Sequence, residues 1–270
     1  MKAVLTIAGS DCSGGAGIQA DLKTFSAHGV FGMSVIVSVV AENTSRVLDI
    51  QDVTPDMIAK QIDAVFEDIE VSAVKIGMLS GPACMAAVAE KLKQYKPLHV
   101  VIDPVMVAKN GAPLMDPSAT STLIELVIPL ADVLTPNIPE AEVITGMTIE
   151  TQEDMKEAAR RIHAMGCKNV LVKGGHAAGD ATDLLYDGEK FYTYATERID
   201  TKNTHGTGCT FSSAIAANLG LGHSLPDAVG RAKEYVTTAI RHSLAIGKGH
   251  GPTHHFYNVY KNGLPEALEN

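Results

Sequence analysis

The chain has 270 residues, of which 46% are hydrophobic and 20% charged, and 31 acidic against 22 basic side chains give a net charge of −9. The apolar content suffices for a packed core and excludes wholesale disorder. The acidic balance argues against a nucleic-acid groove, which needs a basic stripe. It does not exclude an anionic substrate, because backbone N–H groups can hold an anion locally.

The sequence also predicts the cellular location of the protein. No apolar run reaches the length of a membrane span, and the first residues lack the layout of a signal peptide, so no membrane partner is expected. The four cysteines form no CxxC pair, which argues against a disulfide framework or a structural zinc site. We therefore expect a reduced, cytoplasmic location.

Short β-branched runs alternate with longer amphipathic stretches along the chain. The runs predict strands at 3–9, 34–40, 73–78, 99–103, 132–135 and 169–175, and a hairpin of 182–187 with 191–195. The amphipathic stretches predict helices near 16–28, 55–66, 81–94, 117–128, 138–145, 151–164, 207–219 and 224–246. Thr54 and Pro55 suit the N-cap and first turn of the second helix. The run at 34–40 has almost no polar face, which predicts a strand buried on both sides.

This alternation predicts the α/β class, with a mainly parallel sheet covered by helices on both faces. We find no repeat and no linker-like shift in composition, so one domain over residues 1–270 is expected. Ligands of such sheets bind beyond the carboxyl ends of the strands. Candidate site residues are therefore those that directly follow strands.

A glycine-rich loop follows the first strand. Residues 15–20 read GAGIQA, which satisfies the G-x-G-x-x-A form of a dinucleotide fingerprint and allows an NAD-dependent oxidoreductase as one reading. That fingerprint places its first glycine at the strand-to-helix turn, whereas Ser10 to Gly14 intervene here. The longer loop instead suits the wrapping of a small substrate.

The segment TKNTHGTGCTFSS at 201–213 carries the clearest chemical signal. Gly206 and Gly208 bracket Thr207 just before a helix, so backbone N–H groups and the helix dipole converge on one point. Such a site suits a transferring phosphoryl group. Cys209 lies in the first turn, where a thiolate is favoured and the pKa of the thiol is expected to fall, so it is a candidate general base.

Seven blocks of the chain resemble the hydroxymethylpyrimidine/phosphomethylpyrimidine kinases of thiamin biosynthesis, within the ribokinase-like superfamily. In order they are TIAGSDCSGGAGIQADLKTFSAHG (6–29), KIGML (75–79), DPVMVAKNGAPL (103–114), TPNIPEAE (135–142), VKGGH (172–176), TKNTHGTGCTFS (201–212) and GKGHGPTHHF (247–256). The resemblance implies a three-layer α/β/α ribokinase-like fold. It also implies ATP- and Mg²⁺-dependent phosphorylation of the pyrimidine alcohol and then of its monophosphate, and a homodimer.

The resemblance also implies roles for individual residues. Cys209 would be the base, and Gly206, Thr207 and Gly208 the anion hole. Toward the substrate it implies contacts from Gly9, Asp21, Glu42, Met78 and Val105, with Asp21 holding the hydroxymethyl group. A flap from Val105 to Leu114 would close the site, with Lys109 reaching the phosphates. Toward ATP it implies Asn137, Lys173, Asp183 and Thr204, and toward Mg²⁺ Asp103 and Glu140.

One position departs from the family pattern. The segment that usually reads A-Q-N-T reads Ala41-Glu42-Asn43-Thr44 here. An ionised glutamate only accepts hydrogen bonds, whereas a glutamine also donates. Glu42 would pair with a protonated aminopyrimidine through charge-assisted hydrogen bonds. A pyridine with a protonated nitrogen fits as well, so a pyridoxal or pyridoxine kinase, or a dual-specificity enzyme, stays open as the alternative. A non-catalytic nucleotide-binding protein is disfavoured by the intact GTGC block.

Overall fold

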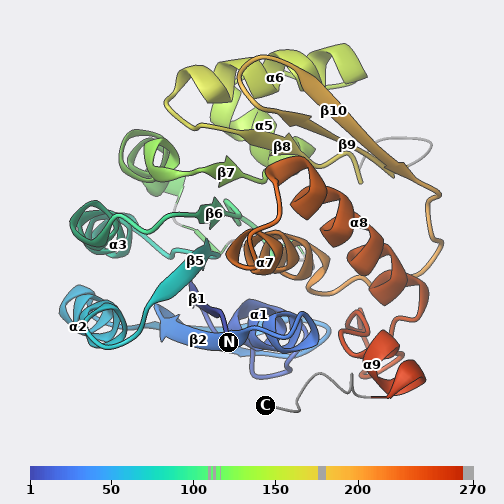
Figure 1. Ribbon diagram of the computed structural model, residues 1–270, viewed down its shortest axis with the longest axis horizontal. Helices are drawn as coiled ribbons and strands as arrows, with labels where there is room; N and C mark the ends of the chain where they lie inside the picture. The colour runs from blue at the N-terminus through green and yellow to red at the C-terminus, as the bar shows by residue number, and fades with distance from the viewer. Residues whose placement is uncertain (109–110, 112–113, 116, 176–180, 264–270) are drawn as a thin grey trace.

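A computed structural model describes residues 1–108, 111, 114–115, 117–175 and 181–263. In this part of the chain, the central sheet has eight strands in the order β10-β9-β8-β7-β6-β5-β1-β2 (Figure 1). They are β1 (Ala3–Ala8), β2 (Phe31–Ile36), β5 (Val71–Ile76), β6 (Val100–Ile102), β7 (Val133–Leu134), β8 (Val170–Val172), β9 (Ala181–Tyr186) and β10 (Phe191–Thr196). Neighbours from β2 to β8 pair in parallel, and the β9–β10 hairpin adds to β8 antiparallel. The predicted, mainly parallel sheet is confirmed.

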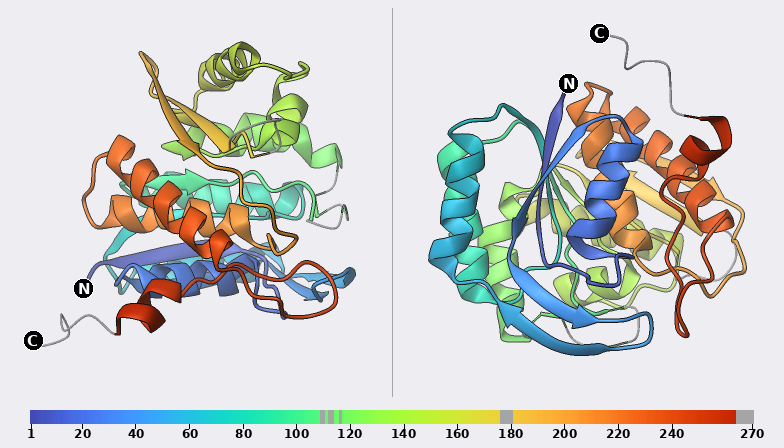
Figure 2. Two further views of the ribbon diagram at one scale, coloured as in Figure 1. Left: turned by 90° about the vertical axis from the view of Figure 1, so that its right-hand side faces the viewer. Right: turned by 90° about the horizontal axis from the view of Figure 1, so that it is seen from below.

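Helices cover both faces of this sheet (Figure 2). One face packs against α2 (Pro55–Phe66), α3 (Pro82–Tyr95), α5 (Ile138–Thr145) and α6 (Gln152–Ala164). The other packs against α1 (Gly17–Ala27), α7 (Thr207–Gly220) and α8 (Leu225–Arg241). Each apolar cluster lies between the sheet and one helical layer, so the three-layer α/β/α architecture is confirmed.

Helix α7 sets the position of its N-terminus at the carboxyl edge of the sheet. Every residue from Thr210 to Gly220 is buried, and most of them are small. Small side chains let the helix contact β1, β5 and β6 on one side and α1 and α8 on the other. The first turn of α7 is less buried, and its position is fixed by the packed helix that follows it.

Helix α2 illustrates how local sequence fixes an element. It begins where predicted, with Pro55 in the first turn and the Thr54 Oγ1 accepting a hydrogen bond from the Met57 N–H at 3.4 Å. Ile58 and Ile62, four residues apart, are fully buried against the sheet.

The predicted strand at 34–40 is wrong, because the chain divides there into two strands. β2 ends at Ile36, and β3 (Ser38–Glu42) leaves the central sheet to pair antiparallel with β4 (Val47–Asp52), which was not predicted. The bend is fixed by hydrogen bonds from the Val37 N–H to the Ala8 carbonyl and from the Ser10 N–H to the Ser38 carbonyl. The β3–β4 ribbon consequently extends beyond the sheet edge (Figure 2).

Three helices differ from prediction. The region expected to form one helix at 117–128 instead runs through 3₁₀ turns at Pro117–Ala119 and Ile128–Leu130, with one α-turn (α4, Thr120–Thr122) and a π-turn (Leu123–Val127) between them. Pro129 lacks the N–H that a continued α-helix would need. Helix α8 ends at Arg241 rather than near 246, because the Leu244 N–H bonds instead to the Pro252 carbonyl. Helix α9 (Tyr257–Asn262) was not predicted.

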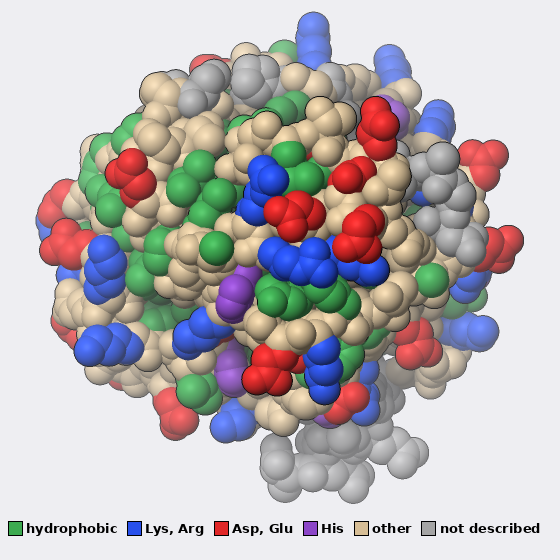
Figure 3. Space-filling model, turned by 90° about the horizontal axis from the view of Figure 1, so that it is seen from above, with side chains coloured by type: hydrophobic (Ala, Val, Ile, Leu, Met, Phe, Trp, Pro, Cys, Tyr) green, Lys and Arg blue, Asp and Glu red, His purple; other side chains and the backbone are tan. Residues whose placement is uncertain are grey.

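Surface charge is mixed rather than segregated. On the face shown in Figure 3, acidic side chains lie beside basic ones. Along α6, Glu153 and Glu157 form ion pairs with Lys156, Arg160 and Arg161. Among the described residues, none of the helices combines the length and the apolar character that crossing a membrane requires.

Candidate active site

A cavity of about 940 Å³ opens at the carboxyl edge of the parallel strands. Its wall includes the glycine loop after β1, the ends of β3, β5, β6 and β8, and the first turn of α7. The structure brings fourteen of the residues singled out from the sequence to this one cavity: Gly9, Glu42, Met78, Asp103, Val105, Asn137, Glu140, Lys173, Asp183, Thr204, Gly206, Thr207, Gly208 and Cys209. Lys109 lies outside the described residues, as do several other positions of the expected flap.

The turn before α7 depends on a glycine. Gly206 has φ +77° and serves as the N-cap, and its carbonyl accepts the Thr210 N–H at 2.9 Å. A Cβ at this position would overlap the Gly15 carbonyl oxygen. Both the backbone angle and the close approach of the two loops therefore exclude a side chain here. The Thr207 hydroxyl donates to the Thr204 carbonyl at 2.9 Å, which closes the turn.

Asp103 and Lys173 form a buried ion pair beside this turn. The Lys173 Nζ lies 2.6 Å from the Asp103 Oδ1, which also accepts from the Thr135 hydroxyl at 3.2 Å. A Cβ built on Gly208 would lie 3.3 Å from the Asp103 Oδ2, so the backbone of the turn approaches this pair closely. Burial opposes the charge of Lys173, but Asp103 and Glu140 outweigh it and raise the pKa of the ammonium.

Glu140 lies near this pair, at the start of α5, where Asn137 forms a parallel β-bridge with Lys173. It forms a capping box with Asn137: the Asn137 N–H donates to the Glu140 Oε2 at 2.8 Å, and the Glu140 N–H donates to the Asn137 Oδ1 at 2.9 Å. Burial raises the pKa of Glu140 to about 7, against the opposing attraction of Lys173. Because Asp103 also raises this pKa, a cation placed between the two carboxylates would stabilise both in the ionised form. These oxygen donors therefore fit Mg²⁺.

Asp183 is occupied by protein groups. Its Oδ1 accepts the Gly174 N–H at 2.9 Å, and its Oδ2 accepts from the Lys233 Nζ at 2.7 Å. Burial raises its pKa despite the attraction of Lys233. Asp183 thus orders this wall of the cavity and positions Lys233.

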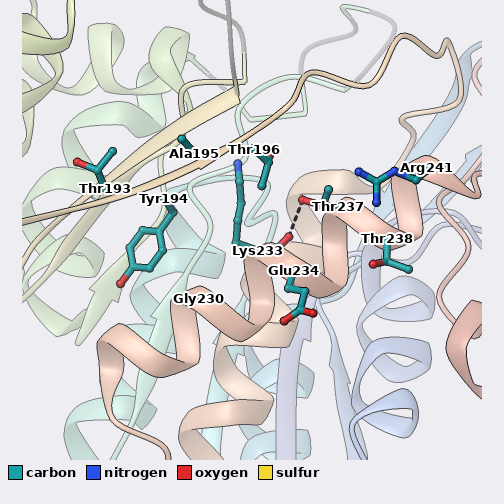
Figure 4. A pocket seen from close by; sticks show the side chains of 10 residues that line it. All are labelled: Thr193, Tyr194, Ala195, Thr196, Gly230, Lys233, Glu234, Thr237, Thr238 and Arg241. Atoms are coloured by element: carbon teal, nitrogen blue, oxygen red, sulfur yellow. Dashed lines mark hydrogen bonds between the residues drawn. The ribbon is translucent and has the colours of Figure 1, made fainter.

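A smaller hollow of about 480 Å³ adjoins the same wall, between β10 and α8 (Figure 4). Thr196, Lys233 and Thr237 line both spaces. In Figure 4 the Thr237 hydroxyl donates to the Lys233 carbonyl, at 2.7 Å, which holds Thr237 against its own helix.

Cys209 contradicts one expectation. Its side chain is half-buried in the first turn of α7, but burial raises the pKa of the thiol to about 11, so the helix start does not lower it below the ordinary value. Lys75 and a hydrogen bond from the Gly17 N–H act in the opposite direction, whereas Asp21 and Asp103 add to the rise. The protein alone therefore holds a neutral thiol at pH 7. The expectation failed because it counted the helix dipole but not the desolvation of the sulfur.

Asp21 lies deeper than the other predicted substrate contacts. It is fully buried and does not line the cavity. Its carboxylate accepts from the Thr6 hydroxyl at 2.6 Å, from the Ser213 hydroxyl at 2.6 Å and from the Lys75 Nζ at 2.9 Å on both oxygens. With these partners Asp21 joins α1, β1, β5 and α7 in the interior. Its contact with the hydroxymethyl group of a substrate stays a prediction.

Three functional candidates were missed in the sequence: Asp11, Lys75 and His205. The buried Asp11 carboxylate accepts hydrogen bonds from Ser13, the Gly15 N–H, the Ala16 N–H and the His205 Nε2. Burial opposes its ionisation, but the bonds from His205, Ser13 and Ala16 outweigh this and hold the pKa of Asp11 well below its usual value. Asp11 therefore links the glycine loop to the residue that precedes the Gly206 turn.

Glu42 lies next to this link. Its carboxylate and the polar atoms of Asp11 and His205 lie within 4.8 Å of one another. Burial and the negative charge of Asp11 raise the pKa of Glu42 to about 7, while His205 opposes them. Cys12 ties the backbone of Glu42 to the glycine loop, with its Sγ 3.0 Å from the Glu42 carbonyl oxygen.

A parallel sheet whose carboxyl edge carries a glycine turn, a helix N-terminus and buried Asp–Lys pairs is the arrangement of a ribokinase-like small-molecule kinase. A model described as phosphomethylpyrimidine kinase matches residues 11–254, and the chain belongs to this family. The residues 15–20 that mimic a dinucleotide fingerprint are thus part of a kinase loop.

Two relatives support the assignment. The chain is 48% identical to the hydroxymethylpyrimidine/phosphomethylpyrimidine kinase of Bacillus subtilis over 93% of this chain and 94% of that protein. It is 54% identical to the thiamine biosynthesis bifunctional protein ThiED of Geobacter sulfurreducens over 93% of its length, but it spans only 52% of that longer protein.

Solved structures are similar as well. The phosphomethylpyrimidine kinase of Clostridium difficile has a TM-score of 0.81 and 50% identity, over 89% of this chain and 100% of that one. The pyridoxal kinase of Bacillus subtilis, in an ADP complex, has a TM-score of 0.89 and 42% identity, over 95% and 98% of the two chains. The fold of this chain is therefore shared by a protein named as a phosphomethylpyrimidine kinase and by one named as a pyridoxal kinase.

Proposed function

We propose that this kinase uses ATP to phosphorylate 4-amino-5-hydroxymethyl-2-methylpyrimidine and then the resulting monophosphate, giving the diphosphate for thiamin biosynthesis. The observation that carries the proposal is the match over residues 11–254, together with the convergence of the glycine turn, Cys209 and two buried Asp–Lys pairs on one cavity. ATP is the phosphoryl donor expected of the family.

In the mechanism that we propose, the substrate ring lies between Gly9, Met78 and Val105, with its polar edge toward Glu42. The N–H groups of Gly206, Gly208 and Cys209 face the phosphoryl group, whose charge grows on its equatorial oxygens during transfer. The Thr207 N–H instead donates to the Thr204 carbonyl at 3.3 Å. Lys173 adds a fixed positive charge beside the turn. The small fraction of Cys209 that is ionised accepts the proton of the hydroxymethyl group as the substrate oxygen attacks phosphorus.

The cofactor is the second part of the proposal. Asp103 and Glu140 would hold Mg²⁺, directly or through water, with Asn137 ordering Glu140 through the capping box. Bound there, Mg²⁺ would neutralise charge on the phosphate oxygens. Thr204 and Asp183 would lie on the nucleotide side. The contact of Lys109 with the phosphates stays a prediction.

The direct test is ADP formation with the pyrimidine alcohol, its monophosphate and pyridoxal, measured side by side at matched concentrations. We expect both pyrimidines to support turnover and pyridoxal to support at least tenfold less, since a missing polar match typically costs a factor of this size or more. No turnover with either pyrimidine would reject the proposal.

A second candidate is pyridoxal phosphorylation, alone or beside the pyrimidine activity. Two observations favour it: the structural similarity to the Bacillus subtilis pyridoxal kinase, and Glu42, whose carboxylate suits a protonated pyridine nitrogen. Pyridoxal turnover equal to or above that of the pyrimidine alcohol would select it. A homodimer and a single domain over 1–270 stay predictions, which light scattering and limited proteolysis check.

A further inference from the structure

Lys75 is a buried charge to which the mechanism above gives no role. It lies within β5, its side chain is 0% exposed, and its Nζ lies 2.9 Å from both oxygens of Asp21. Burying an ammonium is strongly unfavourable unless it is paired. Burial opposes the charge of Lys75, but Asp21 outweighs it and holds the pKa of the ammonium above its usual range. An apolar side chain at this position of β5 would pack in the interior without requiring a charged partner.

The ion pair lies one helical turn beneath the Cys209 thiol. Ser213, which donates to Asp21, follows Cys209 by four residues on α7 and so shares its helix face. Gly17, whose N–H donates to the Cys209 sulfur, precedes Asp21 by four residues on α1. Lys75 and Cys209 both line the cavity. The two helices therefore stack the Cys209–Gly17 contact directly above the Ser213–Asp21 contact.

Gly77 leaves the space that the ammonium occupies. A Cβ at Gly77 would lie 2.8 Å from the Lys75 Nζ and 2.9 Å from the Ala8 Cβ, so only glycine fits here without a shift. The position of the charge itself is held by full burial and by the two contacts with the Asp21 oxygens.

We propose that Lys75 is a positioning residue for the reaction: its fixed ammonium stabilises the Cys209 thiolate, and Asp21 limits how strongly it does so. This rests on the proposed role of Cys209 as base. In the reaction the hydroxyl proton of the substrate passes to the sulfur while the oxygen–phosphorus bond forms and the bond to the ADP leaving group breaks. Lys75 keeps all its protons throughout.

Four charged groups face Cys209 from the elements packed around it. Lys75 on β5 favours the thiolate, whereas Asp21 on α1 and Asp103 after β6 oppose it. Lys173 after β8 is attracted by a Cys209 thiolate and so favours it as well. Lys75 favours the Cys209 thiolate and Asp21 opposes it. Removing Lys75 should therefore raise the pKa of the thiol, and removing Asp21 should lower it. These opposite directions make the proposal testable.

The test measures the rate of Cys209 alkylation by iodoacetamide as a function of pH, without ATP or substrate, in a Cys12→Ser background. Cys12 is the exposed thiol to be removed, and Cys84 and Cys167 are buried. Asp21→Asn removes the competing anion and leaves the thiol as the acid nearest to Lys75, so we expect its titration to move to lower pH. Lys75→Met/Asp21→Asn removes the cation too, and we expect at least tenfold slower alkylation at pH 8 than in Asp21→Asn, equivalent to about one pH unit.

Lys91→Met is the matched control, since Lys91 forms an ion pair with Asp63 at 2.8 Å between α2 and α3. It should leave the alkylation profile unchanged. Identical profiles for Asp21→Asn and the double variant would overturn the proposal. If the double variant does not fold, Asp21→Asn alone decides, because an unchanged or upward shift contradicts it.

Activity provides a separate readout. The pH–rate profile of the first phosphorylation should move to higher pH in the double variant, and that of the second should not. If the alkylation profiles follow the expected signs while Cys209→Ala retains full activity, the base assignment fails and the electrostatic relation stands. The two failures are therefore distinguishable.

Discussion

The two ends of the cavity are built on different principles. At the phosphoryl end, the backbone of 206–209 approaches Gly15 and Asp103 so closely that side chains are excluded at Gly206, and the charges occur in buried pairs. At the ring end, the wall consists of side chains. There Met78 packs against Gly9, and Glu42 changes its charge near neutral pH.

This difference indicates which end fixes the reaction and which end fixes the substrate. A backbone cradle has one geometry, so it suits a phosphoryl group that is common to every substrate. Side chains change with single substitutions, so they suit selection among rings. The similarity of this fold to both pyrimidine and pyridoxal kinases is consistent with that division.

The largest effect should come from closing the backbone cradle. Gly206→Ala places a Cβ against the Gly15 carbonyl and imposes strain at φ +77°. We expect kcat for both phosphorylations to fall about 1000-fold, the upper end of what loss of an oxyanion donor costs. Steady-state ADP release on each substrate measures it.

Gly222→Ala is the control for backbone strain. Gly222 has φ +93° and open space around its Cβ position, beyond the C-terminal end of α7. The variant should lose about 1 kcal/mol of stability and keep its kcat. Equal kinetic losses in the two variants would mean that strain, and not the cradle, explains the effect.

The next largest effect separates the two phosphorylations. Cys209→Ala should lower kcat for the alcohol about 100-fold, the lower end of the range for a general base. The second step uses an ionised phosphate as nucleophile, so it should fall less than tenfold. Single-turnover rates on the alcohol and on the monophosphate provide the comparison, and an equal fall in both steps would exclude Cys209 as the base.

Local signals in the sequence were sufficient for most of the fold. Short-range patterns correctly placed the Thr54–Pro55 start of α2, the helix α7 and the hairpin predicted at 182–187 and 191–195. The division at Val37 was not predictable in this way. Its cause is a pair of hydrogen bonds to Ala8, at the end of β1, and to Ser10 in the loop that follows, both nearly thirty positions away.

The site shows the same limit. The family resemblance identified fourteen residues that the structure places at one cavity, but it did not indicate what each carboxylate contacts. Asp21 is engaged by Lys75, a partner 54 residues away, and Asp11 by His205, a partner 194 residues away. One signal was present: a lysine in the apolar strand AVKIGM is expected to need a buried acid. The acid itself was identifiable only in three dimensions.

An intermediate effect should come from the link between the two ends. Asp11→Asn replaces an acceptor of hydrogen bonds from the glycine loop and from His205 with a group that is half donor. We expect a roughly tenfold change in both kcat and KM, about 1.4 kcal/mol each, because the substrate loop and the phosphate turn both shift. The variant should also lose stability at pH 7, since a carboxyl with a depressed pKa stabilises the fold above its unfolded pKa and ceases to do so in acid.

Asp187→Asn is the matched control for that link. Asp187 accepts backbone N–H groups of Glu189 and Lys190 in the β9–β10 turn, and its pKa is likewise lowered by them. It should lose stability without a change in kcat or KM. If Asp11→Asn behaves in the same way, the link between the two ends has no kinetic role.

The smallest effect tests the ring end, where the division predicts altered binding without altered chemistry. With a pKa of about 7, Glu42 is protonated in mild acid and ionised above neutrality. In the bound state Glu42 and the substrate ring share one proton. Either the carboxyl carries it and the ring is neutral, or the carboxylate faces a protonated ring. The wild-type KM for the alcohol should therefore rise severalfold from pH 6 to pH 8.5 as this proton is lost.

In Glu42→Gln the amide cannot titrate, so the KM should be nearly independent of pH and should exceed that of the wild type most clearly at pH 6, with kcat unchanged. For the stability of the fold, by contrast, the wild-type glutamate is the less favourable residue at high pH. A carboxyl whose folded pKa is raised from 4.5 to about 7 costs the fold stability as pH rises through that interval, so Glu42→Gln should melt above the wild type at pH 8 and with it at pH 4.5. Glu90→Gln, on the exposed side of α3, should change neither quantity. Parallel KM profiles for wild type and Glu42→Gln across pH would show that the protonation of Glu42 does not affect substrate binding. The two ends of the cavity would then differ in shape alone.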